Sequence, residues 1–207
     1  DRSFAVNTPA YDPLYHCQLA IDAGLSAYAA PLGMLQAGVE SFYGQIPTIL
    51  KINSSNTLAQ SMDQAVTGSV DDAIKMGCSA IGFTIYPGSD HNFDLMEEFR
   101  QLSKEAKDKG LAVVLWAYAR GKEISKQGET AMNIISYAAH MSALLGANII
   151  KVKLPTDFIE DDPTKVAFEK KLIEIGSLRD RVAHIKKVAF AGKRIVVFSG
   201  GDTKDDN

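Results

Sequence analysis

The sequence is poor in the features that mark several large classes of proteins. Its two cysteines, Cys17 and Cys78, are too few for a disulfide framework and favour a reducing compartment. No apolar run approaches the roughly 20 residues of a membrane-spanning helix, and no secretory signal peptide is recognisable. The formal net charge of −3 supplies no basic surface for nucleic acid. We therefore expect a cytoplasmic protein without membrane or nucleic-acid partners.

Signals for a metal or a dinucleotide are also missing. The four histidines show no metal-ligand spacing; they are His16, His91, His140 and His184. No Gly-x-Gly-x-x-Gly follows any expected strand, which disfavours a dinucleotide-binding sheet. We expect side chains alone to carry the chemistry, with no metal and no cofactor.

What the chain does contain is an alternation of strands and helices. With 207 residues, 46% of them hydrophobic, it can bury a sizeable core, and we expect one domain over residues 1–207. Six short segments rich in apolar and β-branched residues indicate strands. They are residues 26–30, 48–53, 80–86, 112–118, 148–154 and 194–198. Helices are expected over 13–23, 31–38, 69–76, 92–109 and 130–145, and in segments up to 190, with a polar loop at 54–67.

This alternation predicts an α/β fold with a parallel sheet inside helices. A doubly wound sheet and a (β/α)₈ TIM barrel are the two candidates. We favour the barrel because the unusual polar residues sit where several strands end; among them are Lys51, Thr84, Tyr118, Lys153 and Ser199. A barrel needs eight strands, so we expect the other two outside residues 1–207, in a domain truncated at both ends.

The strand at 148–154 is the most unusual. Side chains alternate between the two faces of a strand, so Lys151 and Lys153 share one face with Ile149. Burying a cation is costly unless it is paired or loses its proton. Lys151 is therefore a candidate reactive amine, with a salt-bridged structural lysine as the alternative. Lys153 has three open roles, which are to lower the pKa of Lys151, to bind phosphate, or to be the nucleophile itself.

Other strand ends supply the remaining candidates. Tyr118 lies two residues beyond Trp116 on the same face, where it suits a proton shuttle, although both are also plausible core aromatics. Lys51 is expected either to pair with a carboxylate or to contact substrate. The glycines of Ser199-Gly200-Gly201 would let backbone N–H groups approach a phosphate, and a plain turn is the alternative.

Several motifs, in this order, resemble one enzyme family. They are Ser3-Phe4-Ala5, Asp12-Pro13, Leu50-Lys51-Ile52-Asn53, Thr84-Ile85-Tyr86-Pro87-Gly88-Ser89, Trp116-Ala117-Tyr118, Gly146-Ala147-Asn148-Ile149-Ile150-Lys151 and Ser199-Gly200-Gly201. The chain is similar to the class I fructose-bisphosphate aldolases of the archaeal and bacterial type. The resemblance implies a Schiff base at Lys151, proton transfer by Tyr118 and phosphate binding by Ser199, Gly200 and Gly201.

The resemblance also implies a substrate class and alternatives to it. The expected reaction cleaves fructose 1,6-bisphosphate to dihydroxyacetone phosphate and glyceraldehyde 3-phosphate, and its partner is therefore a phosphorylated sugar. Family members commonly form homo-oligomers. The acidic first-strand segment and the Gly-Arg pair after the eighth strand of the family are absent from these residues. The alternatives are an aldolase or transaldolase-like enzyme for another phosphorylated ketose, and an inert barrel fragment.

Overall fold

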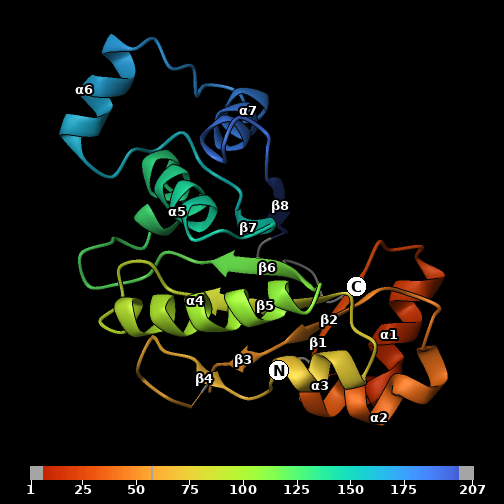
Figure 1. Ribbon diagram of the computed structural model, residues 1–207. Helices are drawn as coiled ribbons and strands as arrows, with labels where there is room; N and C mark the ends of the chain where they lie inside the picture. Colours follow the sequence, from red (N-terminus) through yellow and green to blue (C-terminus); the bar gives the residue numbers. More distant parts are fainter. Residues whose placement is uncertain (1–6, 57, 201–207) are drawn as a thin grey trace.

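Six parallel strands form the centre of the molecule (Figure 1). The computed structural model describes residues 7–56 and 58–200. The strands lie side by side in the order in which they occur in the chain. They are β1 (Tyr28–Pro31), β2 (Thr48–Lys51), β5 (Ala80–Ile85), β6 (Ala112–Ala117), β7 (Ile149–Lys153) and β8 (Ile195–Ser199).

This strand order decides between the two candidate architectures. A doubly wound sheet reverses its order at a switch point, whereas a barrel adds each strand beside the previous one. No reversal occurs among the six strands of this sheet, β1-β2-β5-β6-β7-β8. The predicted α/β fold is confirmed, as an open, six-stranded part of a (β/α) barrel.

Helices cover one face of this sheet, except α6, which projects away from it (Figure 1). They are α1 (Pro13–Asp22), α2 (Leu32–Phe42), α3 (Val70–Lys75), α4 (Asn92–Asp108), α5 (Met132–Leu144), α6 (Asp162–Lys170) and α7 (Leu178–Val188), with short 3₁₀ turns at Thr8–Tyr11 and Gly128–Thr130. The strand side chains on the helix-covered face are fully buried, as at Phe83, Leu115 and Ile150. Burying such side chains stabilises each by about 1.5–3 kcal/mol relative to exposure. The core therefore lies between sheet and helices, and the opposite face is left for chemistry.

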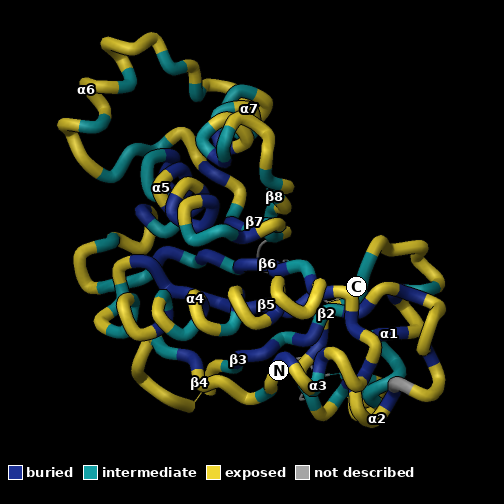
Figure 2. Tube along the Cα trace, viewed as in Figure 1, coloured by how far each residue is buried: buried dark blue, intermediate teal, exposed yellow. Residues whose placement is uncertain are grey.

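The burial pattern separates one helix from the rest (Figure 2). Dark blue, buried segments follow the central strands and α5, whereas α6 projects from the body and contains no buried residue. On the inner face of β8, Ile195 and Val197 are 61% and 42% exposed. Among the described residues β8 is an edge strand of the sheet, which fits this exposure.

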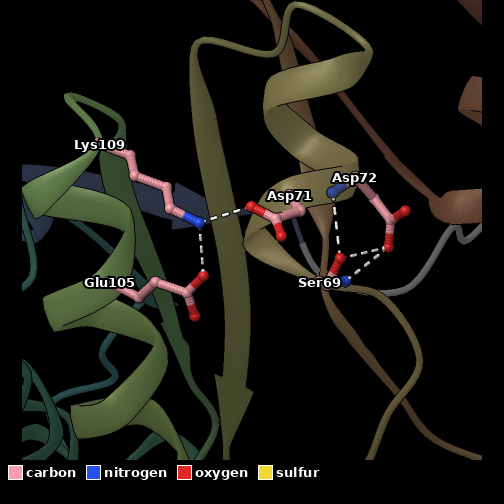
Figure 3. Close-up of polar contacts among 5 residues, drawn as sticks. All are labelled: Ser69, Asp71, Asp72, Glu105 and Lys109. Atoms are coloured by element: carbon pink, nitrogen blue, oxygen red, sulfur yellow. Dashed lines mark hydrogen bonds and ion pairs between the residues drawn. The ribbon is translucent and has the colours of Figure 1, made fainter.

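Helix boundaries follow the capping residues of the sequence. Asp12 accepts from the backbone N–H of Leu14 at the start of α1, as predicted. At α3, Ser69 and Asp72 form a reciprocal capping box (Figure 3). Beside it, Lys109 of the α4 C-cap contacts Asp71 at 2.5 Å and Glu105 at 2.8 Å, joining α3 to α4. Because these pairs are exposed to solvent, each contributes little to the stability of the fold.

Several predicted boundaries differ from those of the structure, and two of them have a clear cause. The second helix continues past Gly38 to Phe42, because Gly38 is a close-packing point and not a helix end. A Cβ at Gly38 would lie 2.3 Å from Cε1 of Phe42 and 2.8 Å from Cδ2 of Leu14. The first strand begins at Tyr28 and not at residue 26, because its pairing with β2 starts where Tyr28 lies opposite Thr48.

The expected polar loop at 54–67 contains a small hairpin. Strand β3 (Asn53–Ser54) pairs antiparallel with β4 (Ala65–Val66). The backbone N–H of Thr67 returns to the carbonyl of Ile52 at 2.8 Å. The chain thus leaves the end of β2, forms the hairpin, and returns to Ile52 at the start of the loop.

Candidate functional site

The inner face of the sheet brings the predicted side chains into adjacent positions. Parallel registers pair Trp116 of β6 with Thr84 of β5 on one side and with Lys151 of β7 on the other. One step towards the strand ends, Lys153 pairs with Ser199 of β8. Lys51 of β2 pairs with Gly82 of β5. The candidate residues therefore lie along one continuous wall.

Lys151 is partly buried on this wall. Burial lowers the pKa of its amine below the ordinary lysine value. Within residues 7–56 and 58–200, its ammonium group makes no hydrogen bond or ion pair. The neutral amine is thus favoured by its surroundings, and a nucleophilic lysine needs this condition.

Lys153 differs from Lys151 in being paired. Its Nζ lies 2.7 Å from Oε2 of Glu129, whose side chain is only 13% exposed. Burial alone would raise the pKa of Glu129, but hydrogen bonds and charge from Lys153 and Lys126 outweigh it and lower the pKa. The suggestion that Lys153 lowers the pKa of Lys151 is not supported, because burial is the cause of that shift. Because its Nζ contacts a carboxylate, Lys153 is a weaker candidate nucleophile than Lys151.

Tyr118 continues the wall beyond β6. Burial raises the pKa of its phenol, and an interaction with the Ser199 hydroxyl partly opposes this rise. Both residues line a cavity of about 460 Å³ at the carboxyl ends of β6, β7 and β8. Its wall also includes Arg120, Lys126, Thr130, Lys153, Leu154 and Gly200. Lys151 lies deeper, one inward-facing position before Lys153, and Gly201 lies outside the described residues.

Trp116 crosses the wall because β5 carries a glycine there. A Cβ on Gly82 would lie 2.0 Å from Cζ3 and 2.4 Å from Cη2 of the indole. The indole therefore lies over the backbone of Gly82 and reaches towards β2. There the Nζ of Lys51 stands 6.0 Å from the ring centroid, within range of a cation–π interaction when the amine is charged.

We predict that Gly82→Ala displaces the indole. Because the added methyl group would overlap two ring atoms, we expect a loss of about 1–3 kcal/mol in the free energy of unfolding, typical of overpacked interiors. Urea unfolding and the emission maximum of Trp116, the single tryptophan of the sequence, measure the effect. The control is Gly33→Ala, where a Cβ meets nothing within 4 Å. Wild-type stability and emission in Gly82→Ala would contradict this packing.

Lys51 is held by uncharged acceptors. Its Nζ donates to Oδ1 of Asn53 at 2.6 Å and to Oε1 of Gln64 at 3.2 Å, and it also contacts the carbonyl oxygen of Asn53. Of the two roles expected for Lys51, pairing with a carboxylate is not found among the described residues, and contact with substrate stays a prediction. Burial without a compensating anion lowers the pKa of Lys51 to about 7.

Three residues of this region were not singled out from the sequence. Glu129 comes from the loop before α5, and Gln64 comes from the hairpin loop. Arg120 stands 5.5 Å over the ring of Tyr86 and keeps its Nε buried with no partner among the described residues. Only the position of Arg120, two residues after Tyr118, gave a usable signal, because side chains two apart share a face.

The described residues contain no group of three side chains of the metal-binding types placed to hold an ion. In the same residues, no helix is both long enough and apolar enough to cross a membrane. The site consists of amines, a phenol, an indole and hydroxyl and backbone groups. Such a set can form a covalent imine, transfer protons and bind an anion.

Comparisons with known proteins agree with this chemistry. A family model described as "DeoC/LacD family aldolase" matches residues 2–206. The fructose-bisphosphate aldolase class 1 of Thermoproteus tenax is 36% identical over 156 residues, covering 74% of this chain and 57% of that protein. The enzyme of the same name from Halobacterium salinarum is 34% identical over 196 residues, covering 94% of this chain and 65% of that protein.

Solved structures give the same picture. An archaeal fructose-1,6-bisphosphate aldolase, with its catalytic lysine bound to the carbinolamine intermediate of the substrate, matches with a TM-score of 0.76 and 31% identity. That match covers 98% of this chain and 70% of the other. The chain spans less than two thirds of the length of the two curated relatives.

Proposed function

The chain belongs to the DeoC/LacD family of aldolases, and we propose that it carries out Schiff-base cleavage of fructose 1,6-bisphosphate, and the reverse condensation. The observation that supports this most strongly is the amine of Lys151, which lies beside Trp116 on the inner face of the sheet. Among the described residues this amine has no ion-pair or hydrogen-bond partner, and burial lowers its pKa. The products would be dihydroxyacetone phosphate and glyceraldehyde 3-phosphate.

In the proposed reaction, the neutral Nζ of Lys151 attacks the C2 ketone of the sugar. A lysine with an ordinary pKa near 10.4 is neutral only about 4 times in 10,000 at pH 7, so the lowered pKa increases the reactive fraction. Loss of the C2 oxygen as water leaves an iminium ion. Its positive nitrogen accepts the electron pair of the C3–C4 bond as that bond breaks, which gives an enamine and an aldehyde.

Tyr118 would move the protons. Because burial raises the pKa of its phenol, Tyr118 begins protonated and can donate to the departing C2 hydroxyl. The phenolate that results can accept the C4 hydroxyl proton during cleavage and then return it to the enamine carbon. Hydrolysis of the new iminium ion releases dihydroxyacetone phosphate and the free amine.

The cavity beside Tyr118 would hold a phosphate group of the sugar. Arg120, Lys126 and Lys153 supply positive charge, and Ser199 and Gly200 supply a hydroxyl group and an approachable backbone. Glu129 neutralises part of this charge by pairing with both lysines. The guanidinium of Arg120, which has no ion-pair partner among the described residues, would therefore be the main anion ligand in the cavity.

The test is trapping with borohydride. Incubation with dihydroxyacetone phosphate and sodium borohydride should reduce the iminium ion to a stable secondary amine, and peptide mapping should place the adduct on Lys151. A panel of phosphorylated ketoses should give the highest kcat/KM for fructose 1,6-bisphosphate. An adduct on another lysine, no adduct, or a faster reaction with a different ketose would overturn the corresponding part of the proposal.

We also propose that the protein self-associates, on the basis of the family resemblance. The low cysteine content supports a cytoplasmic location, which we propose as well.

A further inference from the structure

The hairpin loop places one buried amide in the middle of the site wall. Gln64 is only 8% exposed although it lies in a polar loop. Its Oε1 accepts from Nζ of Lys51 at 3.2 Å, and its Nε2 donates to the hydroxyl of Tyr86 at 2.6 Å. A buried amide that satisfies two side chains from two strands is costly to misplace, because each lost partner leaves a desolvated polar group.

The backbone of Gln64 and its neighbour Asp63 make further contacts. The backbone N–H of Gln64 donates to Oδ1 of Asp63 at 2.7 Å, and Asp63 lies 3.6 Å from Nδ1 of His91 beside α4. Asn53 completes the frame, since its side chain accepts from the N–H of Thr84 at 2.8 Å and donates to the Thr84 carbonyl at 2.9 Å. The hairpin is thus attached to β5 by hydrogen bonds.

We propose that Gln64 is a positioning residue that holds the Lys51 amine against the Trp116 indole and so sets the shape of this wall of the site. The chain of contacts runs from Tyr86 through Gln64 and Lys51 to the indole, which neighbours Lys151 in register. The expected effect of Gln64 on catalysis rests on the proposed function. Its effect on the positions of the Lys51 amine and the Trp116 indole does not.

The electrostatics make this arrangement measurable. Burial lowers the pKa of Lys51 to about 7, so its charge changes at neutral pH. A protonated amine above an indole alters its emission, and Trp116 is the single tryptophan of the sequence. On one side of the Gln64 amide lie Tyr86 and Arg120, whose guanidinium stands over the Tyr86 ring. On the other side lie Asp63 and His91. Burial is the cause of the lowered pKa of Lys51, and none of these charges contributes to it.

Tryptophan emission from pH 5 to 10, without substrate, tests the proposal. We expect a transition near pH 7 in the wild type that is absent in Lys51→Met. Gln64→Glu should raise the midpoint by about one pH unit or more, since an adjacent carboxylate stabilises the ammonium form. Gln64→Leu should lower the midpoint, because a hydrogen bond to that form is lost. The matched control is Gln60→Leu, in the same loop and exposed, which should titrate as the wild type does.

The outcomes are separable from those of the proposed function. No wild-type transition, a transition that survives in Lys51→Met, or unchanged midpoints in both Gln64 variants would overturn the positioning role. If the midpoints shift as expected, kcat/KM for fructose 1,6-bisphosphate should also fall in Gln64→Leu and recover in part in Gln64→Asn. If the midpoints shift but the wild type cleaves no sugar, the proposed function fails and the positioning of Lys51 stands.

Discussion

Lys151→Met should abolish borohydride trapping and reduce kcat for sugar cleavage by about 10⁴-fold or more, because loss of the nucleophile removes the covalent route as a whole. Methionine keeps the length and apolar stem of lysine. Since the amine is partly buried and unpaired among the described residues, its removal should not lower the free energy of unfolding. Steady-state kinetics, peptide mapping of the trapped adduct and urea unfolding measure these three quantities.

The matched control is Lys153→Met, on the same face of the same strand. This change removes a partner of Glu129 and a positive charge from the cavity, so KM should rise while the adduct on Lys151 persists. If Lys153→Met abolished trapping and Lys151→Met retained it, the nucleophile would be Lys153. The pairing with Glu129 would then have to break when substrate binds.

Tyr118→Phe should leave the covalent adduct in place and lower kcat by about 10²- to 10⁴-fold, the usual contribution of a positioned acid–base group. Phenylalanine preserves the ring that lines the cavity and removes only the hydroxyl that interacts with Ser199. Single-turnover kinetics should show that Lys151 still forms an iminium ion, but more slowly, and that carbon–carbon cleavage and protonation of the enamine are slower too.

A tyrosine away from the site provides the control. Tyr137 of α5 is 64% exposed, and Tyr137→Phe should match the wild type in trapping and in kcat. A kcat in Tyr118→Phe within a few-fold of the wild type would exclude the phenol as the proton shuttle. The next candidate for the proton shuttle would be the hydroxyl of Tyr86, which accepts a hydrogen bond from Gln64.

The fold was predictable to a large extent because its signals are local. Strands such as Ala112–Ala117 are apolar on both faces. Caps such as Asp12 and Ser69 start helices by hydrogen bonds to groups within a few residues. The errors occurred where distant atoms decide. Packing of Gly38 against Phe42 and Leu14 let α2 continue, and pairing with β2 set the start of β1.

Within the site, the sequence by itself determined which side chains share a face. The two-residue period of a strand puts Trp116 with Tyr118, and Lys151 with Lys153. Only the tertiary structure decided how these pairs meet, because the register between neighbouring strands depends on the whole sheet. It set Trp116 against Lys151 and seated the indole over Gly82.

The different partners of Lys51 and Lys153 were likewise decided by tertiary contacts. Glu129 pairs with Lys153 across 24 residues of sequence, and Gln64 reaches Lys51 across 13. Neither distance has a periodic signature, because loops connect the elements. The environment of each of these two amines depends on its burial and on the partner that folding places beside it. Both are properties of three-dimensional position.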